Sequence, residues 1–246
     1  MQKATNYIHI QRSIILCMIF FLLTSCKWSN WRTFKNKCEN EFTKYVKVER
    51  DIELGKISFS KPILTPKDVK LVSKKEPSKT ETTDKNTIAH FICVRIGEDK
   101  PDHYNLNFRV IYNQNSKMTT FNFPRQFCEM FPNDDPSLTV MIRKILQADL
   151  NFWGDTLSNQ IAITPHSSLK LPSKGHLISV YGPSDSKTPH TLTYNYTVKA
   201  DPTDPSAVTA GRKVQIFFRF NEQKQITRIK MTMSSVIIDL TVNYNR

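Results

Sequence analysis

Residues 103–123 read HYNLNFRVIYNQNSKMTTFNF, and this stretch decides the fold class. Large apolar side chains occupy every second position over 104–112, and polar residues stand at most positions between them. Residues 113–116 (NQNS) are typical of turns, and Phe121 and Phe123 then resume a period of two. The pattern predicts an antiparallel hairpin with one face on the core and one face in water.

The strand pattern continues on both sides of this hairpin. Further strands are predicted near 52–59 and over 87–96, 160–164, 176–181, 191–199, 213–220, 225–234 and 236–242. Bulky apolar residues share one face of several strands: Leu106, Phe108 and Val110, then Ile216, Phe218 and Phe220, then Ile229, Met231 and Met233. Such a sheet must either curl to bury that face or leave a groove for an apolar ligand or partner.

Two amphipathic helices are predicted to accompany the strands. Over about 28–49, Trp31, Phe34, Cys38, Phe42 and Tyr45 recur at steps of three and four. Over about 136–153, Asp135 is placed as N-cap and Pro136 as the first helical residue before an apolar stripe. We expect both helices to cover a sheet, although the first could instead lie on a membrane surface. The fold class is therefore α+β, with a large curved antiparallel sheet and two helices.

The chain divides into four parts by composition. Residues 1–25 form an N-terminal signal, and 26–59 carry the first helix and the first strand. Residues 60–86 mix lysine, proline, serine and threonine, which predicts a mobile loop. Residues 87–246 form a β-rich domain that contains the second helix.

The N-terminus has the features of an export signal. Lys3 and Arg12 precede the apolar run 14–23 (IILCMIFFLL), and no acidic residue occurs before Cys26. The run fits the roughly 7–15 residues of a secretory signal and is shorter than the ~20 residues of a membrane-spanning helix. We therefore expect residues 1–25 to be removed on export.

Leu23-Thr24-Ser25-Cys26 at the end of this run resembles the lipobox of bacterial lipoproteins. The resemblance implies cleavage between Ser25 and Cys26, a diacylglyceryl group on the Cys26 thiol, and acylation of the new amino terminus. Several acyl chains make a lasting membrane anchor, whereas one chain binds reversibly. Lys27 directly follows the lipidated cysteine. An Asp at this position would resemble the inner-membrane retention signal of bacterial lipoproteins, so Lys27 favours the outer membrane over the inner membrane.

The chain is basic, with a net charge of +13. Removal of residues 1–25 takes away Lys3 and Arg12 and leaves +11. Such a charge favours anionic partners, for which lipid headgroups or an acidic envelope protein are the candidates. An exported, lipidated protein rarely meets nucleic acid, so we expect no nucleic-acid partner.

Cys38, Cys93 and Cys128 remain in the body of the exported chain. Cys93 and Cys128 are candidates for a disulfide because they lie in or just beyond strands of the same region, which leaves Cys38 under its helix. The alternative is that all three are small buried hydrophobic side chains. None of them has a C-x-x-C neighbour or a histidine at ligand spacing. The sequence also has no G-x-G-x-x-G, P-loop, H-E-x-x-H or G-x-S-x-G motif, so we expect no metal, no cofactor and no enzymatic activity.

Two functions remain open. The first is a membrane-anchored, non-enzymatic envelope lipoprotein that binds another envelope component through its sheet or loops. The second is a carrier or acceptor of lipid or lipoprotein. The order of anchor, aromatic helix, antiparallel strands, mid-chain helix and final alternating hairpin is similar to that of the outer-membrane receptor of the lipoprotein-sorting system, from which 60–86 departs. A sizeable apolar cavity on the inner face of the sheet would favour the carrier, and a filled face would favour the binding module.

Overall fold

A computed structural model describes ten stretches of the chain and the single residue Thr33. The stretches are 46–50, 55–97, 100–131, 137–147, 151–153, 156–165, 169–186, 188–199, 213–233 and 236–244. The signal peptide, the lipobox and most of the predicted helix 28–49 lie outside these residues.

The described strands form one sheet of twelve strands. In chain order they are β1 Val46–Arg50, β2 Gly55–Phe59, β3 Lys79–Thr82, β4 Asn86–Arg95, β5 Leu106–Asn113, β6 Met118–Asn122, β7 Asn151–Trp153, β8 Thr156–Ile163, β9 Thr191–Val198, β10 Lys213–Phe220, β11 Ile226–Met233 and β12 Val236–Val242. Their order across the sheet is β1-β2-β6-β5-β4-β9-β10-β11-β12-β8-β7. The strand β3 lies off this path and pairs with residues 87–90 of β4.

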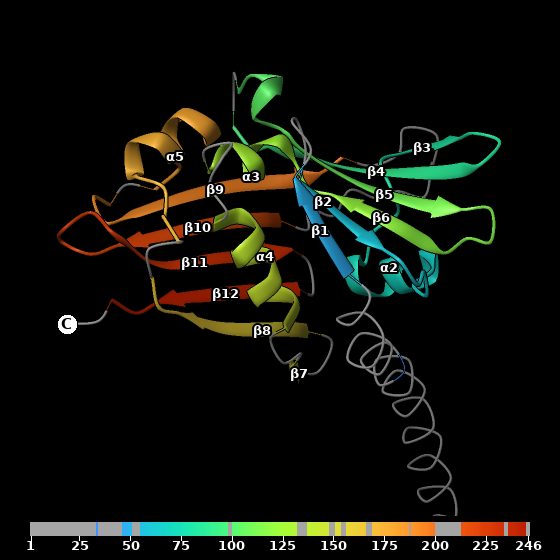
Figure 1. Cartoon of the computed structure of the whole chain (residues 1–246). Helices are drawn as coiled ribbons and strands as arrows, with labels where there is room; N and C mark the ends of the chain where they lie inside the picture. The colour runs from blue at the N-terminus through green and yellow to red at the C-terminus, as the bar shows by residue number, and fades with distance from the viewer. Residues whose placement is uncertain are drawn as a thin grey trace, which may run out of the picture.

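Four α-helices and one short 3-10 helix connect the described strands. They are α2 Pro66–Ser73, η2 Asp102–Tyr104, α3 Arg125–Glu129, α4 Ser137–Gln147 and α5 Lys174–Tyr181. Figure 1 shows α3, α4 and α5 on the side of the sheet toward which it curls. The predicted α+β class and the curved sheet are confirmed.

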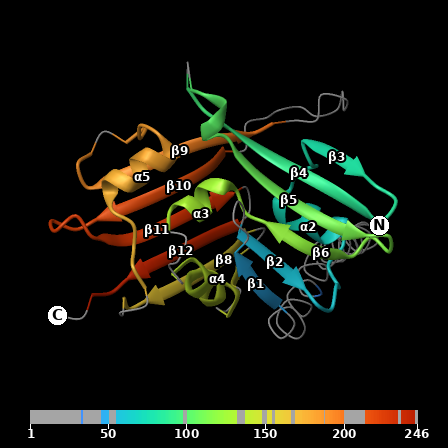
Figure 2. The ribbon, with the colours of Figure 1, turned by 45° about the horizontal axis from the view of Figure 1, so that its top comes forward.

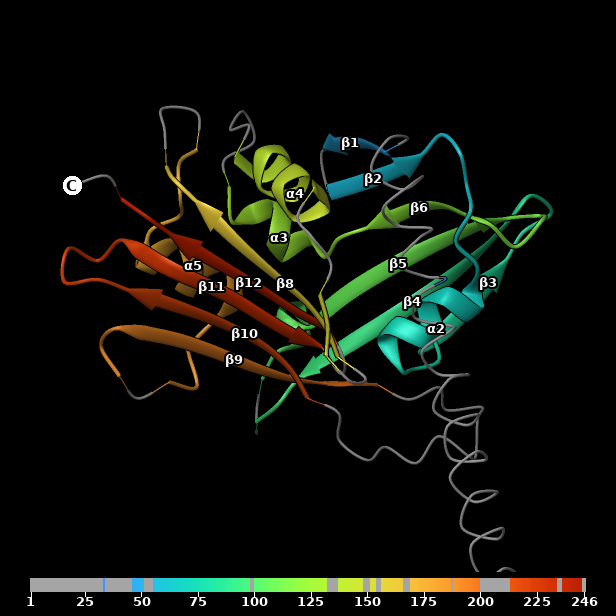
Figure 3. The same cartoon turned by 90° about the horizontal axis from the view of Figure 1, so that it is seen from below.

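The sheet consists of two halves that meet where β4 pairs with β9 (Figure 2). This junction consists of three residue pairs, from Cys93 opposite Val198 to Arg95 opposite Tyr196. Beyond it the two strands separate, and the halves enclose α3 and α4 between them (Figure 3). The curl therefore creates a hollow whose walls come from both ends of the chain.

The hairpin that decides the fold class forms as predicted. β5 and β6 pair antiparallel, and β5 alternates buried residues with more exposed ones. Asn113 closes the turn, because its amide donates to the carbonyl of Lys117 and its side-chain oxygen accepts from the amides of Asn115 and Lys117. The turn 221–224 between β10 and β11 also forms as predicted.

Three expectations about the two helices and the strand directions are wrong in part. Residues 46–50 form β1 rather than the end of a helix, since Val46 and Val48 pair with Phe59 and Ile57 of β2. The second helix ends at Gln147, and residues 151–153 pair with β8 instead. The sheet is mixed rather than purely antiparallel, because β8 runs parallel to β12.

Residues 60–86, predicted as a mobile loop, contain α2 and β3. Thr65 starts α2 with a capping box: its hydroxyl accepts from the amide of Asp68, and the Asp68 carboxylate accepts from the amide of Thr65. This reciprocal cap and Pro66 at the first helical position stabilise a helix in a polar segment.

Residues 176–181, predicted as a strand, belong to helix α5. The Ser173 hydroxyl caps this helix by accepting from the amide of His176. Leu177 and Tyr181, four residues apart, are its two fully buried side chains, so tertiary packing decides between helix and strand for this short apolar run. Among the described residues, no helix is long and apolar enough to cross a membrane.

Candidate functional site: an apolar cavity in the curled sheet

The hollow of the sheet contains a cavity of about 330 Å³. This volume lies at the lower end of the range of ~300–1,000 Å³ that is usual for small-molecule sites. The sheet halves and the four described α-helices contribute its lining: Ile57, Phe59, Val72, Phe108, Met118, Phe121, Phe123, Phe127, Met130, Leu138, Met141, Ile142, Ile145, Tyr181, Ile216, Phe218, Ile229, Met231, Met233, Val236, Ile238 and Leu240. Among the described residues that line the cavity, Tyr181 alone carries a hydroxyl, which donates to Sδ of Met130 at 2.8 Å.

Strand register places the floor of the cavity. In the second half of the sheet, Ile216 of β10 stands opposite Met231 of β11, which stands opposite Ile238 of β12. Phe218, Ile229 and Leu240 form the next row in the same way. Because side chains alternate between the two faces of a strand, both rows point into the hollow. The apolar face predicted from the sequence is therefore the face that lines the cavity.

Helix α4 closes one side of the cavity. Leu138, Met141, Ile142 and Ile145 are spaced by three and four residues and line it together. Hydrogen bonds at two positions fix the helix. The amide of Lys170 donates to the Ser137 hydroxyl at 2.7 Å, and Nδ2 of Asn159 on β8 donates to the carbonyl of Ile145 at 2.9 Å.

Methionine is frequent in the lining. The methionines at 118, 130, 141, 231 and 233 contribute to it, out of seven in the whole chain. A thioether side chain is unbranched and has several rotatable bonds, so it can adapt to ligands of different shape. The lining therefore suits flexible hydrocarbon and offers it no directional polar contact.

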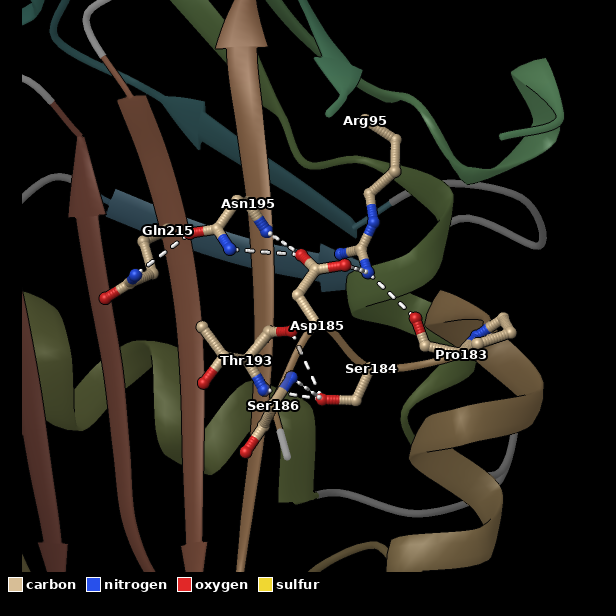
Figure 4. Close-up of polar contacts among 8 residues, drawn as sticks. All are labelled: Arg95, Pro183, Ser184, Asp185, Ser186, Thr193, Asn195 and Gln215. Atoms are coloured by element: carbon tan, nitrogen blue, oxygen red, sulfur yellow. Dashed lines mark hydrogen bonds and ion pairs between the residues drawn. The ribbon is translucent and has the colours of Figure 1, made fainter. Parts of the chain in front are cut away.

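A buried polar cluster lies at the junction of the sheet halves, and Figure 4 shows its polar contacts around Arg95 and Asp185. The Arg95 side chain is 1% exposed, and its Nη2 donates to the Pro183 carbonyl and to Oδ1 of Asp185, both at 2.9 Å. Oδ2 of Asp185 in turn accepts from the amide and from Nδ2 of Asn195. The guanidinium lies over the rings of Tyr194 and Tyr196, at 4.6 and 5.3 Å from their centres.

Four polar atoms of this cluster are buried and make no hydrogen bond of normal geometry in the described part of the chain. They are Nε and Nη1 of Arg95 and the hydroxyls of Tyr194 and Tyr196. Burial raises the pKa of Tyr196 to about 12, and it raises the pKa of Tyr194 as well. The positive charge of Arg95 acts in the opposite direction on both, and a hydrogen-bonding interaction with the Arg95 side chain does so on Tyr196. Both tyrosines are therefore neutral at physiological pH and can donate a hydrogen bond.

The predicted site residues fall into two groups. Ser25 and Cys26 lie outside the described residues, as does Cys38. Cys93 and Cys128 are both described, and the predicted disulfide between them is not formed: each is a buried thiol. Cys128 Sγ accepts from the amide of Gly55, and burial raises the pKa of Cys93 to about 12. Among the described residues, no three His, Cys, Asp or Glu side chains converge as metal ligands.

Arg95 is the site residue that the sequence analysis missed. Its signal is the period of two in β4, where Ala89, Phe91 and Cys93 are buried and Arg95 follows on the same face. A charged residue in phase with the buried residues of a strand indicates a buried ion pair or a binding group.

The chain was compared with protein-family models, curated proteins and solved structures. No protein-family model, no curated protein and no solved structure matches this chain.

Proposed function

We propose that this protein is a membrane-anchored bacterial lipoprotein that binds an acyl chain in the cavity of its curled sheet. The observation that supports this proposal is the cavity itself, which is about 330 Å³ in volume and is lined by apolar side chains from both halves of the sheet. A module that used only its surface loops would need no such space, since protein interiors are normally packed to the density of organic crystals.

The cavity favours the carrier over the envelope-binding module with a filled sheet. A single hydrocarbon chain matches a lining that has no directional polar group, and lipid or lipoprotein is the cargo that an anchored envelope protein meets. The lipobox-like sequence at Cys26 supports anchoring, and Lys27 supports the outer membrane. Binding needs no catalytic group, so the protein acts as a non-enzymatic, periplasm-facing carrier or acceptor.

Photo-crosslinking tests the cavity. Purified full-length protein, in a steroid-based detergent, is irradiated with a fatty acid that carries a diazirine near the end of its chain. We expect cross-links on peptides that contain lining residues such as Met231 and Met233. Ile238→Trp fills the cavity and should abolish them, whereas Ile237→Trp, on the opposite face of the same strand, should not. Equal labelling of both variants would contradict acyl-chain binding in the cavity.

Metabolic labelling tests the anchor. Cells that express the full chain are grown with an alkyne analogue of palmitate. The wild-type protein should be labelled and processed, and Cys26→Ala should be neither. Label retained in Cys26→Ala would show that the lipid is attached elsewhere.

A further inference from the structure

We propose that Arg95, Tyr194 and Tyr196 bind the carboxylate of a fatty acid whose chain occupies the apolar cavity. This inference rests on the proposed function, because it assigns the polar end of the same ligand. It narrows the ligand class from hydrocarbon in general to acyl chains with a free acid group.

The polar cluster adjoins the cavity floor. Tyr194 of β9 stands opposite Ile216 of β10, so it extends the row that continues through Met231 and Ile238. The other three members of this row line the cavity. The ring of Tyr181, which also lines the cavity, lies 5.2 Å from the ring of Tyr194. A ligand that follows the row therefore reaches the cluster after one strand spacing, about 4.8 Å.

The cluster has hydrogen-bonding capacity to spare. A guanidinium carries five N–H donors, and Arg95 uses those of Nη2 on Pro183 and Asp185. Within the described ranges, Nε and Nη1 of Arg95 and the hydroxyls of Tyr194 and Tyr196 make no hydrogen bond of normal geometry, although the Arg95 side chain does interact with the Tyr196 hydroxyl. Buried polar groups are nearly always hydrogen-bonded, so the Tyr194 hydroxyl and the remaining N–H groups of Arg95 indicate an occupant that supplies acceptors.

The charge of the cluster selects the kind of acceptor. Arg95 carries a positive charge, and Asp185 is its carboxylate partner among the described residues. Asp185 also accepts from two N–H groups of Asn195. A carboxylate only accepts hydrogen bonds and is negatively charged, so it matches the Arg95 and tyrosine donors with charge-assisted bonds. An alcohol would bring its own donor and no charge. Ordered water is the competing occupant, and the experiment separates it from a ligand.

The experiment compares hexadecanoate with hexadecanol on full-length protein. Displacement of the diazirine probe gives the affinity of each. Tyr194→Phe and Tyr196→Phe remove one hydroxyl each and keep the ring, and Tyr112→Phe is the matched control, at a buried tyrosine of β5 outside the cluster. We expect each cluster variant to bind hexadecanoate about tenfold more weakly, the worth of one hydrogen bond to a charged group. Hexadecanol affinity should stay unchanged, and the control should alter neither.

Thermal stability without ligand supplies the second readout. Removal of a buried hydroxyl that makes no hydrogen bond of normal geometry should leave the melting temperature of Tyr194→Phe and Tyr196→Phe unchanged or higher. The contrary result is a lower melting temperature of these two variants together with an equal loss of affinity for hexadecanoate and hexadecanol. It would show that the hydroxyls hold a structural water, and it would overturn the carboxylate site. Hexadecanol binding would then still support the cavity. Binding of neither ligand by the wild type would overturn both proposals.

Discussion

Asp185→Asn is expected to destabilise the protein strongly, because it leaves a buried positive charge without compensation. The Arg95 side chain is 1% exposed and Asp185 is 23% exposed, so water screens their ion pair little. The amide of the new asparagine would also face two donors, since Oδ2 of Asp185 accepts from the main-chain N and Nδ2 of Asn195. Loss of one partner of a buried pair costs about 3–5 kcal/mol, out of roughly 5–15 kcal/mol for a whole domain.

Urea unfolding of the full chain, followed by tryptophan fluorescence, measures this cost. With a slope of ~2 kcal/mol per molar urea, the midpoint should fall by roughly 1.5–2.5 M. Glu129→Gln is the control, because it breaks the exposed Arg125–Glu129 pair, spaced i,i+4 on α3 and worth about 0.3–0.5 kcal/mol. A midpoint for Asp185→Asn within ~0.3 M of the control would refute the view that Arg95 depends on this carboxylate.

Three further outcomes are expected. Gly182→Ala should lower the free energy of unfolding by about 1–3 kcal/mol in the same assay, because φ is +78° and a Cβ would lie 2.6 Å from Cζ of Tyr104. Cys93 should resist iodoacetamide at pH 8 in native protein and react after denaturation, as peptide mapping would show, because burial raises its pKa to about 12. The hydrogen bond from Arg228 holds the pKa of Asp239 below its usual 3.8. The ionised Asp239 therefore stabilises the folded protein above pH 3.8, and this contribution is lost as the pH falls further. Melting temperatures at pH 3 and 7 should therefore differ less in Asp239→Asn than in the wild type.

The strands were predictable where one face is buried and the other meets water. β5, β9 and β10 alternate strictly, and a period of two is visible in sequence without tertiary information. Residues 174–181 lack such a signal, since a short apolar run fits either a buried strand or a helix. The parallel pairing of β8 with β12 was not predictable, because it depends on a long connection and not on local periodicity.

The sequence predicted which residues would line a cavity, but it could not predict that a cavity would form. Sequence periodicity placed Phe218, Ile229, Met231 and Met233 on one face, and all four line the cavity. Whether such a face is filled depends on how α3 and α4 pack inside the curl, which no local pattern encodes. The polar cluster depends on where the pairing of β4 with β9 ends. The amide of Ile96 still donates to the Asn195 carbonyl, and beyond it the amide of Asp185 donates to the Thr193 carbonyl of β9 instead.

The size of the cavity bears on the stability of the fold itself. Without a ligand, the side chains that line it lack the close contacts of a packed interior, and each such lost contact lowers the free energy of unfolding. Water would recover little of this loss, because an apolar lining offers a water molecule almost no hydrogen-bond partners. The side chains that bind the proposed acyl chain are therefore the same side chains whose burial the fold needs, and occupancy and stability are linked.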